Sequence, residues 1–261
     1  ASDTEMLDNF TYNIFPNLLA RLPETDWASA TGHGSLGSAL QGRGDWDAAE
    51  TELRRAVELG LAHHNGTLDL ADWHNLLGGF LLDRGRAGVA GELEAALQEY
   101  QQAEAIIRQK ARPRSHKLAL TLNNLGAVRD TMGEKEAARD LYEEALDIWQ
   151  EILPERDTRL GASLTNVGSM AVVLGQTVRA EALLRECLDI EKAAYAEAPR
   201  HPEIIITVRW LVSALLVLGR HDAARWAEAE ALCRKFGLDF AERELIAARY
   251  PDPVDGPDTG V

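Results

Sequence analysis

The chain has 261 residues, of which 46% are hydrophobic and 26% charged, a composition typical of a soluble globular protein that excludes a disordered chain. Its 27 Lys and Arg residues against 42 Asp and Glu residues give a formal net charge of −15. This acidity argues against nucleic acid or an anionic membrane surface as a partner, because both carry negative charge themselves. Two cysteines, Cys187 and Cys233, are too few for a disulfide framework and lack metal-type spacing, so we predict reduced thiols in the cytoplasm.

The N-terminal segment predicts a short helical cap over residues 1–28. Apolar residues follow helical spacing at Met6, Phe10, Ile14 and Leu18, and Pro16 should kink or split the helix. The first ten residues are acidic and no apolar run reaches 18 residues, which indicates neither a signal peptide nor a membrane span. A start without Met is what we expect of a region cut from a larger protein.

Internal repeats dominate the rest of the sequence. The segment LTLNNLGAVRDTMGEKEAARDLYEEALDIWQEIL aligns without gaps on SLTNVGSMAVVLGQTVRAEALLRECLDIEKAAY, with a period of 42 residues. The same unit occurs upstream, with six extra residues in RAGVAGE, and downstream. Five units are predicted in chain order, over residues 29–66, 67–114, 115–156, 157–199 and 200–236.

Each unit divides into two helices at a central glycine. Glycine can adopt the left-handed conformation that ends a helix, so the pattern predicts helix, tight turn, helix. Apolar residues recur at intervals of three and four on both sides of the glycine, as on one face of a helix. The dividing glycines are Gly44, Gly85, Gly133, Gly175 and Gly219.

The C-terminal region differs from the repeats. The segment FGLDFAERELIAARY predicts an amphipathic capping helix over 237–250, since an exposed last face of a repeat array would aggregate. The Pro, Gly and Asp-rich end predicts a flexible tail over 251–261.

The repeat unit resembles the tetratricopeptide repeat, whose signature is a large residue, Leu-Gly, Ala, a large aromatic or aliphatic residue, and Ala. The 42-residue period, HPEIIITVRWL and LTLNNLGAV look most like the longer form found in kinesin light chains and bacterial signalling proteins. The resemblance implies an all-α, right-handed superhelix, an α-solenoid of about five helix-turn-helix repeats with helical ends. It implies little about function, because unrelated proteins use the same repeat as a scaffold.

The resemblance also implies where a partner would bind, because the family reads its ligands from the first helix of each repeat, on the concave face. Asn offers a donor and an acceptor to the backbone of an extended peptide, although Asn124 and Asn166 could equally hold adjacent helices together. Arg209 is the only basic residue at these positions, so we do not expect a clamp for a peptide carboxylate. The predicted peptide-binding residues are Asn75, Asn123, Asn124, Thr165, Asn166, Ser169, Arg209 and Ser213.

A histidine-rich segment, LAHHNGTLDLADWH, leaves an enzyme or a metal site open as the alternative. Imidazole and carboxylate could bind a divalent metal, but His63, His64 and His74 match no closed ligand set, and Asp69 is well placed as a helix N-cap. Trp210 could stack on a ligand or pack between repeats. No nucleophile motif or phosphate loop is present, and we predict no catalytic residue, metal or cofactor.

The sequence therefore predicts a protein- or peptide-binding scaffold or adaptor module in the cytoplasm, of unknown oligomeric state. The runner-up within this class is the sensor or regulatory region of a larger signalling protein.

Overall fold

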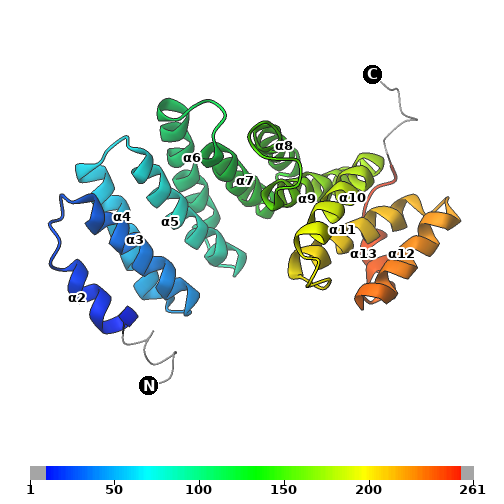
Figure 1. Ribbon diagram of the computed structural model, residues 1–261, viewed down its shortest axis with the longest axis horizontal. Coiled ribbons are helices and arrows are strands. Elements are labelled where there is room, and N and C mark those ends of the chain that lie inside the picture. Colours follow the sequence, from blue (N-terminus) through cyan, green and yellow to red (C-terminus); the bar gives the residue numbers. More distant parts are fainter. Residues whose placement is uncertain (1–9, 254–261) are drawn as a thin grey trace. The chain divides into compact units, whose positions relative to one another are not determined.

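The computed structural model describes residues 10–253, and these residues form helices and no strand (Figure 1). The predicted position of Met6 in the N-terminal cap, and residues 254–261 of the predicted tail, lie outside the described residues. The chain divides into two compact units, residues 1–132 and 133–261.

The first unit begins with a π-helical turn that passes directly into a short helix. Pro16 lies in the first turn of that helix, where its missing N–H breaks no hydrogen bond. The elements of the unit are η1 (Phe10–Ile14), α2 (Phe15–Leu19), α3 (Trp27–Gly42), α4 (Trp46–His63), α5 (Leu68–Arg86), α6 (Glu92–Lys110) and α7 (His116–Thr131).

The second unit is a run of five long helices and a short last one. Its elements are α8 (Lys135–Ile152), α9 (Thr158–Val173), α10 (Thr177–Ala194), α11 (Pro202–Leu218), α12 (Ala223–Phe236) and α13 (Phe240–Ala247). In both units, helices adjacent in sequence pack against each other: α3 on α4 and α5 on α6 in the first, α9 on α10 and α11 on α12 in the second. The first helices of successive pairs also touch, α3 with α5 and α9 with α11, so they lie side by side. The division into five repeats with the predicted boundaries stays a prediction.

The turns follow the predicted glycine pattern at three of five positions. Gly44, Gly133 and Gly175 have φ values of +81°, +86° and +79°, in the left-handed region. The expectation for Gly85 was wrong, because helix α5 continues through Gly85, and Gly88 and Gly91 make the longer turn with φ values of +89° and +80°. Gly219 does end α11, but with a φ of −69°, outside the left-handed region.

Side-chain caps begin most of the long helices. Thr67, and not Asp69 as the sequence suggested, caps α5, because its hydroxyl accepts a hydrogen bond from the Leu70 amide while Asp69 lies in the first turn. Serine or aspartate does the same at α3, α7, α9, α12 and α13.

Small residues on the first helix let a large residue of the second approach closely. A Cβ added at Gly78 would lie 3.0 Å from the Tyr100 ring, and one at Gly168 would lie 2.8 Å from Leu184 Cγ. The core of each unit forms along these contacts, where Tyr100 is 2% and Leu184 0% exposed.

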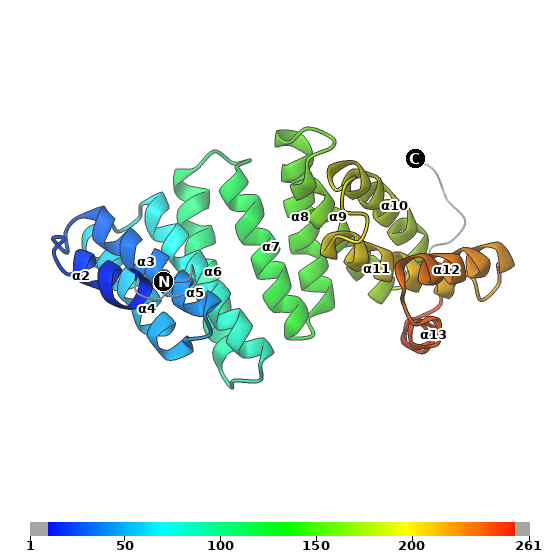
Figure 2. The same cartoon turned by 60° about the horizontal axis from the view of Figure 1, so that its bottom comes forward.

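Helix α13 has a position that the sequence does not specify. It packs mainly against α11, and less against α12. Figure 2 shows α13 following α12. Arg220 holds the chain there by donating to the carbonyl oxygens of Ala247 at 2.9 Å and Tyr250 at 3.1 Å, and it forms an ion pair with Asp252.

Candidate functional site

The predicted binding residues fall on four first helices, two in each unit. Asn75 lies on α5 and Asn123 and Asn124 on α7, within the first unit. In the second unit the residues are Thr165, Asn166 and Ser169 on α9, and Arg209 and Ser213 on α11.

A groove of about 350 Å³ brings two of these residues together in the first unit. Helix α3 lies beside α5 and α5 beside α7, and the groove runs over all three. Asn75 and Asn124 both line it, and both are half-buried. The other polar side chains on its walls are Ser38, Gln41, Asp83, Arg86 and Tyr100.

The groove carries donors, acceptors and both signs of charge. Gln41 donates to Asp83 at 2.8 Å, which joins α3 to α5. Burial, and then the nearby Asp83 carboxylate, raise the pKa of the Tyr100 hydroxyl, so it stays a neutral donor. Such a lining suits the alternating N–H and C=O groups of a peptide backbone.

Asn75 also has a structural bond. Its amide group exchanges hydrogen bonds with the Thr121 hydroxyl at 3.0 and 3.1 Å, which ties α5 to α7. Asn124 has no such bond to a side chain within residues 10–253 and keeps its amide available to the groove. Asn123 does not line the groove, and its Oδ1 is buried without a hydrogen-bond partner among the described residues.

Thr165 belongs to a sealed polar cluster between α9, α10 and α11. Its hydroxyl lies 3.0 Å from Cys187 Sγ and 3.0 Å from the Thr207 hydroxyl, which in turn donates to Glu191 at 3.1 Å. Burial raises the pKa of Cys187 to about 12 and also raises the pKa of Glu191. The thiol is therefore neutral and donates to the Gly161 carbonyl at 3.1 Å, so it is not a reactive nucleophile.

The remaining predicted residues divide by exposure. Ser169 and Ser213 are 8% and 2% exposed, and their hydroxyls donate to the backbone carbonyls of Asn166 and Arg209. Asn166 is half-buried and Arg209 is exposed. Arg209 and Ser213 line a second hollow, of about 180 Å³, between α11 and α13.

That hollow contains residues beyond the predicted set. Trp210 of α11 and Tyr250, which comes after α13, form its aromatic walls with ring centroids 6.2 Å apart. Arg243 of α13 also lines it and is 5% exposed. We call this hollow, lined by Ile206, Arg209, Trp210, Ser213, Arg243, Ile246 and Tyr250, the α11–α13 pocket.

The histidine side chains of the histidine-rich segment do not come together at one site. His74 Nδ1 lies 2.6 Å from a Glu99 oxygen, which accepts its hydrogen bond, whereas the His64 ring packs edge-on against Trp73 at 5.9 Å. His33 pairs in the same way with Glu52 at 2.5 Å in the preceding helix pair. Among residues 10–253, no group of three or more His, Cys, Asp or Glu side chains is arranged to hold a metal ion.

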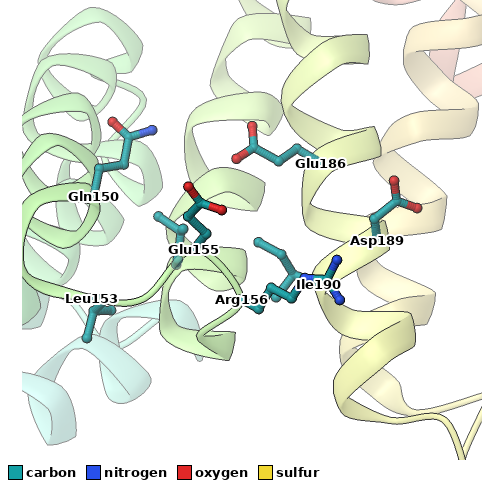
Figure 3. Close-up of a pocket in the computed structure, with 8 residues that line it drawn as sticks. Gln150, Leu153, Glu155, Arg156, Glu186, Asp189 and Ile190 are labelled. Atoms are coloured by element: carbon teal, nitrogen blue, oxygen red, sulfur yellow. The ribbon is translucent and has the colours of Figure 1, made fainter.

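A larger hollow of about 450 Å³ lies beside α10 and is mainly acidic. Figure 3 shows Glu186 and Asp189 on α10 and Glu155 and Arg156 on the connection from α8 to α9. One guanidinium faces three carboxylates, and all four side chains are exposed. The hollow is therefore a solvated acidic surface.

Sequence reasoning missed several of the residues that these sites contain. The repeat pattern assigns Tyr100 to packing only, and Gln41, Asp83 and Arg86 lie at the ends of first helices, outside the positions that the family uses. Arg243 lies in a different helix from Arg209, 34 positions later, and no period links them.

Comparison with known proteins agrees with this geometry. The family model described as Tetratricopeptide repeat matches residues 69–151. The structure of BtubC (BKLC) from P. vanneervenii is similar over 100% of this chain and 99% of that chain, with 20% identity and a TM-score of 0.73. A Podosopora anserina kinesin light chain structure with nearly identical TPR-like repeats matches 85% of this chain and 96% of its own, at 17% identity and a TM-score of 0.64. No curated protein matches the sequence significantly.

The fold and the repeat define an all-α helical-repeat protein of the solenoid class. Residues 69–151 match the tetratricopeptide repeat model, and the fold of the chain is similar to that of solved proteins with TPR-like repeats. None of the described helices has the length and apolar character needed to cross a membrane.

Proposed function

We propose that this protein is a scaffold or adaptor module that binds a protein or peptide through the groove on α3, α5 and α7. The tetratricopeptide repeat fold generally mediates protein interaction, which gives the class of partner. The observation that carries the proposal is that the groove joins three first helices and is lined by both the half-buried Asn124 amide and the Tyr100 hydroxyl. The wider predicted surface, with Asn123, Asn166 and Arg209, remains part of the proposal.

Charge supports a polypeptide partner over the other macromolecules. A net charge of −15 repels phosphate backbones and anionic lipids at long range, whereas a peptide backbone is neutral. The sequence predictions of a cytoplasmic location and of a signalling context stay part of this proposal, and the two free, buried cysteines are in keeping with a reducing compartment.

Catalysis is not included in the proposal. His64 and His74 contact different residues, Trp73 and Glu99, and the buried Cys187 thiol is neutral. No observation on the described residues favours the enzyme or metal-binding alternative at His63, His64 and His74.

The experiment is peptide selection by display on the purified protein, followed by affinity measurement of the selected peptides by fluorescence anisotropy. Asn124→Arg fills the groove with a long charged side chain and should weaken binding at least tenfold. Gln102→Arg makes the same change on the exposed side of α6 and is the matched control. Its affinity should equal that of the wild type.

The melting temperatures of both variants are measured alongside, because a fold defect would imitate a loss of binding. Equal melting temperatures with selective loss in Asn124→Arg support the groove. Peptides that bind Asn124→Arg as tightly as wild type, or a failure to select any peptide, would show that the groove is not the binding site.

A further inference from the structure

The α11–α13 pocket is a basic site in an acidic protein. It has a volume of about 180 Å³ and lies wholly within the second unit. Two arginines line it, Arg209 from α11 and Arg243 from α13, and no acidic side chain does.

Arg243 is unusual because its side chain is buried although its guanidinium has a single hydrogen-bond partner among the described residues. It is 5% exposed, and within residues 10–253 its guanidinium makes one hydrogen bond, from Nη2 to the neighbouring Glu242 at 2.5 Å. The Glu242 side chain is 59% exposed, so solvent screens much of this pair. A guanidinium has five N–H donors, and a buried charge is costly unless its donors find acceptors. Several Arg243 donors therefore lack an acceptor in the part of the chain that the structure describes.

Arg209 lines the same pocket as Arg243 but is exposed to solvent. Arg209 is exposed and makes no ion pair with any described residue, although most arginines of this chain do. Burial raises the pKa of the Tyr250 hydroxyl, and the charges of Arg243 and Arg249 act in the opposite direction. Glu242 and Asp252 form ion pairs with Arg243 and Arg220, respectively.

The remaining walls are apolar or aromatic. Ile206, Ile246, Trp210 and Tyr250 surround the arginines, and Ser213 keeps its hydroxyl on the Arg209 carbonyl. Apolar walls strengthen a charge-assisted hydrogen bond by excluding water, and arginine binds a carboxylate through two parallel N–H donors. The pocket is too small for a folded partner and admits a carboxylate with one attached side chain.

We propose that the α11–α13 pocket binds a carboxylate group of the partner, between Arg209 and Arg243. This proposal rests on the proposed function, because the proposed function makes the ligand part of a polypeptide. It differs from a clamp built only from first helices, because the capping helix α13 supplies the buried cation. The carboxylate comes from a peptide C-terminus or from an acidic side chain.

The test uses small defined probes and the full chain. N-acetyl-leucine, with a free carboxylate, is titrated into labelled protein, and the indole N–H signal of Trp210 is followed by NMR after assignment with Trp210→Phe. N-acetyl-leucinamide has the same side chain without the charge. The acid should shift the Trp210 signal to saturation, and the amide should not shift it. An equal shift with both probes, or none with the acid, would overturn the proposal.

Variants show whether the arginines are responsible. Arg209→Gln changes an exposed residue and should weaken N-acetyl-leucine binding at least fivefold without changing the melting temperature. Arg243→Lys keeps the buried charge but loses the two-pronged geometry, and it should weaken binding several-fold. Arg234→Gln is the matched control, because the Arg234 side chain is 73% exposed on α12 and should have no effect. Wild-type affinity in Arg209→Gln would rule the pocket out as a carboxylate site.

A third probe distinguishes the two sources of carboxylate. N-acetyl-glutamic acid α-amide carries its charge only on the side chain, so tighter binding than N-acetyl-leucine indicates recognition of an acidic residue, and weaker binding indicates a C-terminus. The outcome is independent of the groove on α3, α5 and α7. Loss of the acid signal with peptide binding intact rejects only the pocket, and loss of peptide binding with the acid signal intact rejects only the groove.

Discussion

The two units bury polar groups between their helices in opposite ways. In the first unit, His33 with Glu52 and His74 with Glu99 form separate pairs within one helix pair each, and the glutamate side chains stay 24% exposed. In the second unit, Thr165, Cys187, Thr207 and Glu191 join three helices in a cluster in which each residue is at most 8% exposed. The equivalents of the His74–Glu99 pair in the fourth repeat are Leu164 and Leu183.

The two units also differ in how open the surface of their first helices is. The first unit leaves an open polar groove over its first helices, whereas α13 covers the face of α11 in the second unit. The glutamates of the two pairs in the first unit therefore reach solvent, whereas the Thr165 cluster of the second unit is buried. One repeat sequence thus supports both an open groove over α3, α5 and α7 and a face of α11 that is covered by α13.

The largest expected effect is the loss of a core ring in the first unit. Tyr100→Ala should lower the free energy of unfolding by about 3–5 kcal/mol, because the ring fills the space left by Gly78 and a cavity would remain. Leu184→Ala makes the equivalent change in the second unit and should cost about 2–5 kcal/mol. Urea denaturation measures both, with Leu61→Ala, at a 50% exposed position, as a control that should change stability little. A cost for Tyr100→Ala no larger than that of the control would contradict the packing.

Variants of the His74–Glu99 pair test whether this buried polar pair contributes to the stability of the first unit. Glu99→Leu removes the acceptor of the buried His74 N–H and should cost about 1–3 kcal/mol. The double variant His74→Leu with Glu99→Leu copies the fourth repeat and should recover wild-type stability within about 1 kcal/mol, or exceed it. Thermal unfolding at a fixed pH gives both values. A double variant less stable than Glu99→Leu alone would show that the apolar pattern of the later repeats cannot be transferred.

The covered face of α11 depends on Arg220. Arg220→Ala removes two hydrogen bonds to carbonyl oxygens near the chain end and should cost about 1–2 kcal/mol. Hydrogen exchange of residues 240–250 should accelerate, while exchange in α9 and α10 stays unchanged. Arg54→Ala is the control, because Arg54 is 53% exposed and pairs only with Glu50 on its own helix. Equal exchange of residues 240–250 in both variants would mean that Arg220 does not hold α13 in place.

The smallest expected effect is a pH dependence confined to the sealed cluster. Burial raises the pKa of Glu191 above its ordinary value of 4.5, so the folded protein holds this proton more tightly than the unfolded chain. The stability that Glu191 contributes is complete below its unfolded pKa and is lost as the pH rises through the raised pKa. Compared with Glu191→Gln, the wild type should therefore become progressively less stable as the pH increases from 4.5.

Asp157 provides the control of opposite sign. Hydrogen bonds from Arg159 lower the pKa of Asp157 to about 2, so its contribution is present above its unfolded pKa of 3.8 and is lost as the pH falls toward 2. Asp157→Asn should leave the pH dependence between about 5 and about 8 unchanged. A Glu191→Gln variant whose stability follows the wild-type curve over that range would show that the carboxyl is not desolvated in the folded protein.

The sequence determined the helical repeat itself, for a local physical reason. A period of 42 residues with apolar positions at intervals of three and four specifies two amphipathic helices, and left-handed glycines such as Gly133 and Gly175 end the first of them. The apolar spacing and the glycines act within one helix or turn, and the period is visible by aligning the sequence on itself, so these signals can be read without the fold. The placement of Asn75 and Asn124 on neighbouring first helices also followed from the repeat.

Only the tertiary structure decided which side chains meet, because contacts between helices depend on packing that no period encodes. An added Cβ at Gly37 of α3 would lie 2.6 Å from Leu53 Cγ, so that glycine permits a close approach. Arg243 joins Arg209 because α13 packs on α11, and the direction of a capping helix is set by the last repeat and not by its own amphipathic pattern. Likewise, His74 of α5 forms a hydrogen bond with Glu99 of the facing helix α6, so a residue that the sequence offered as a metal ligand has a structural partner instead.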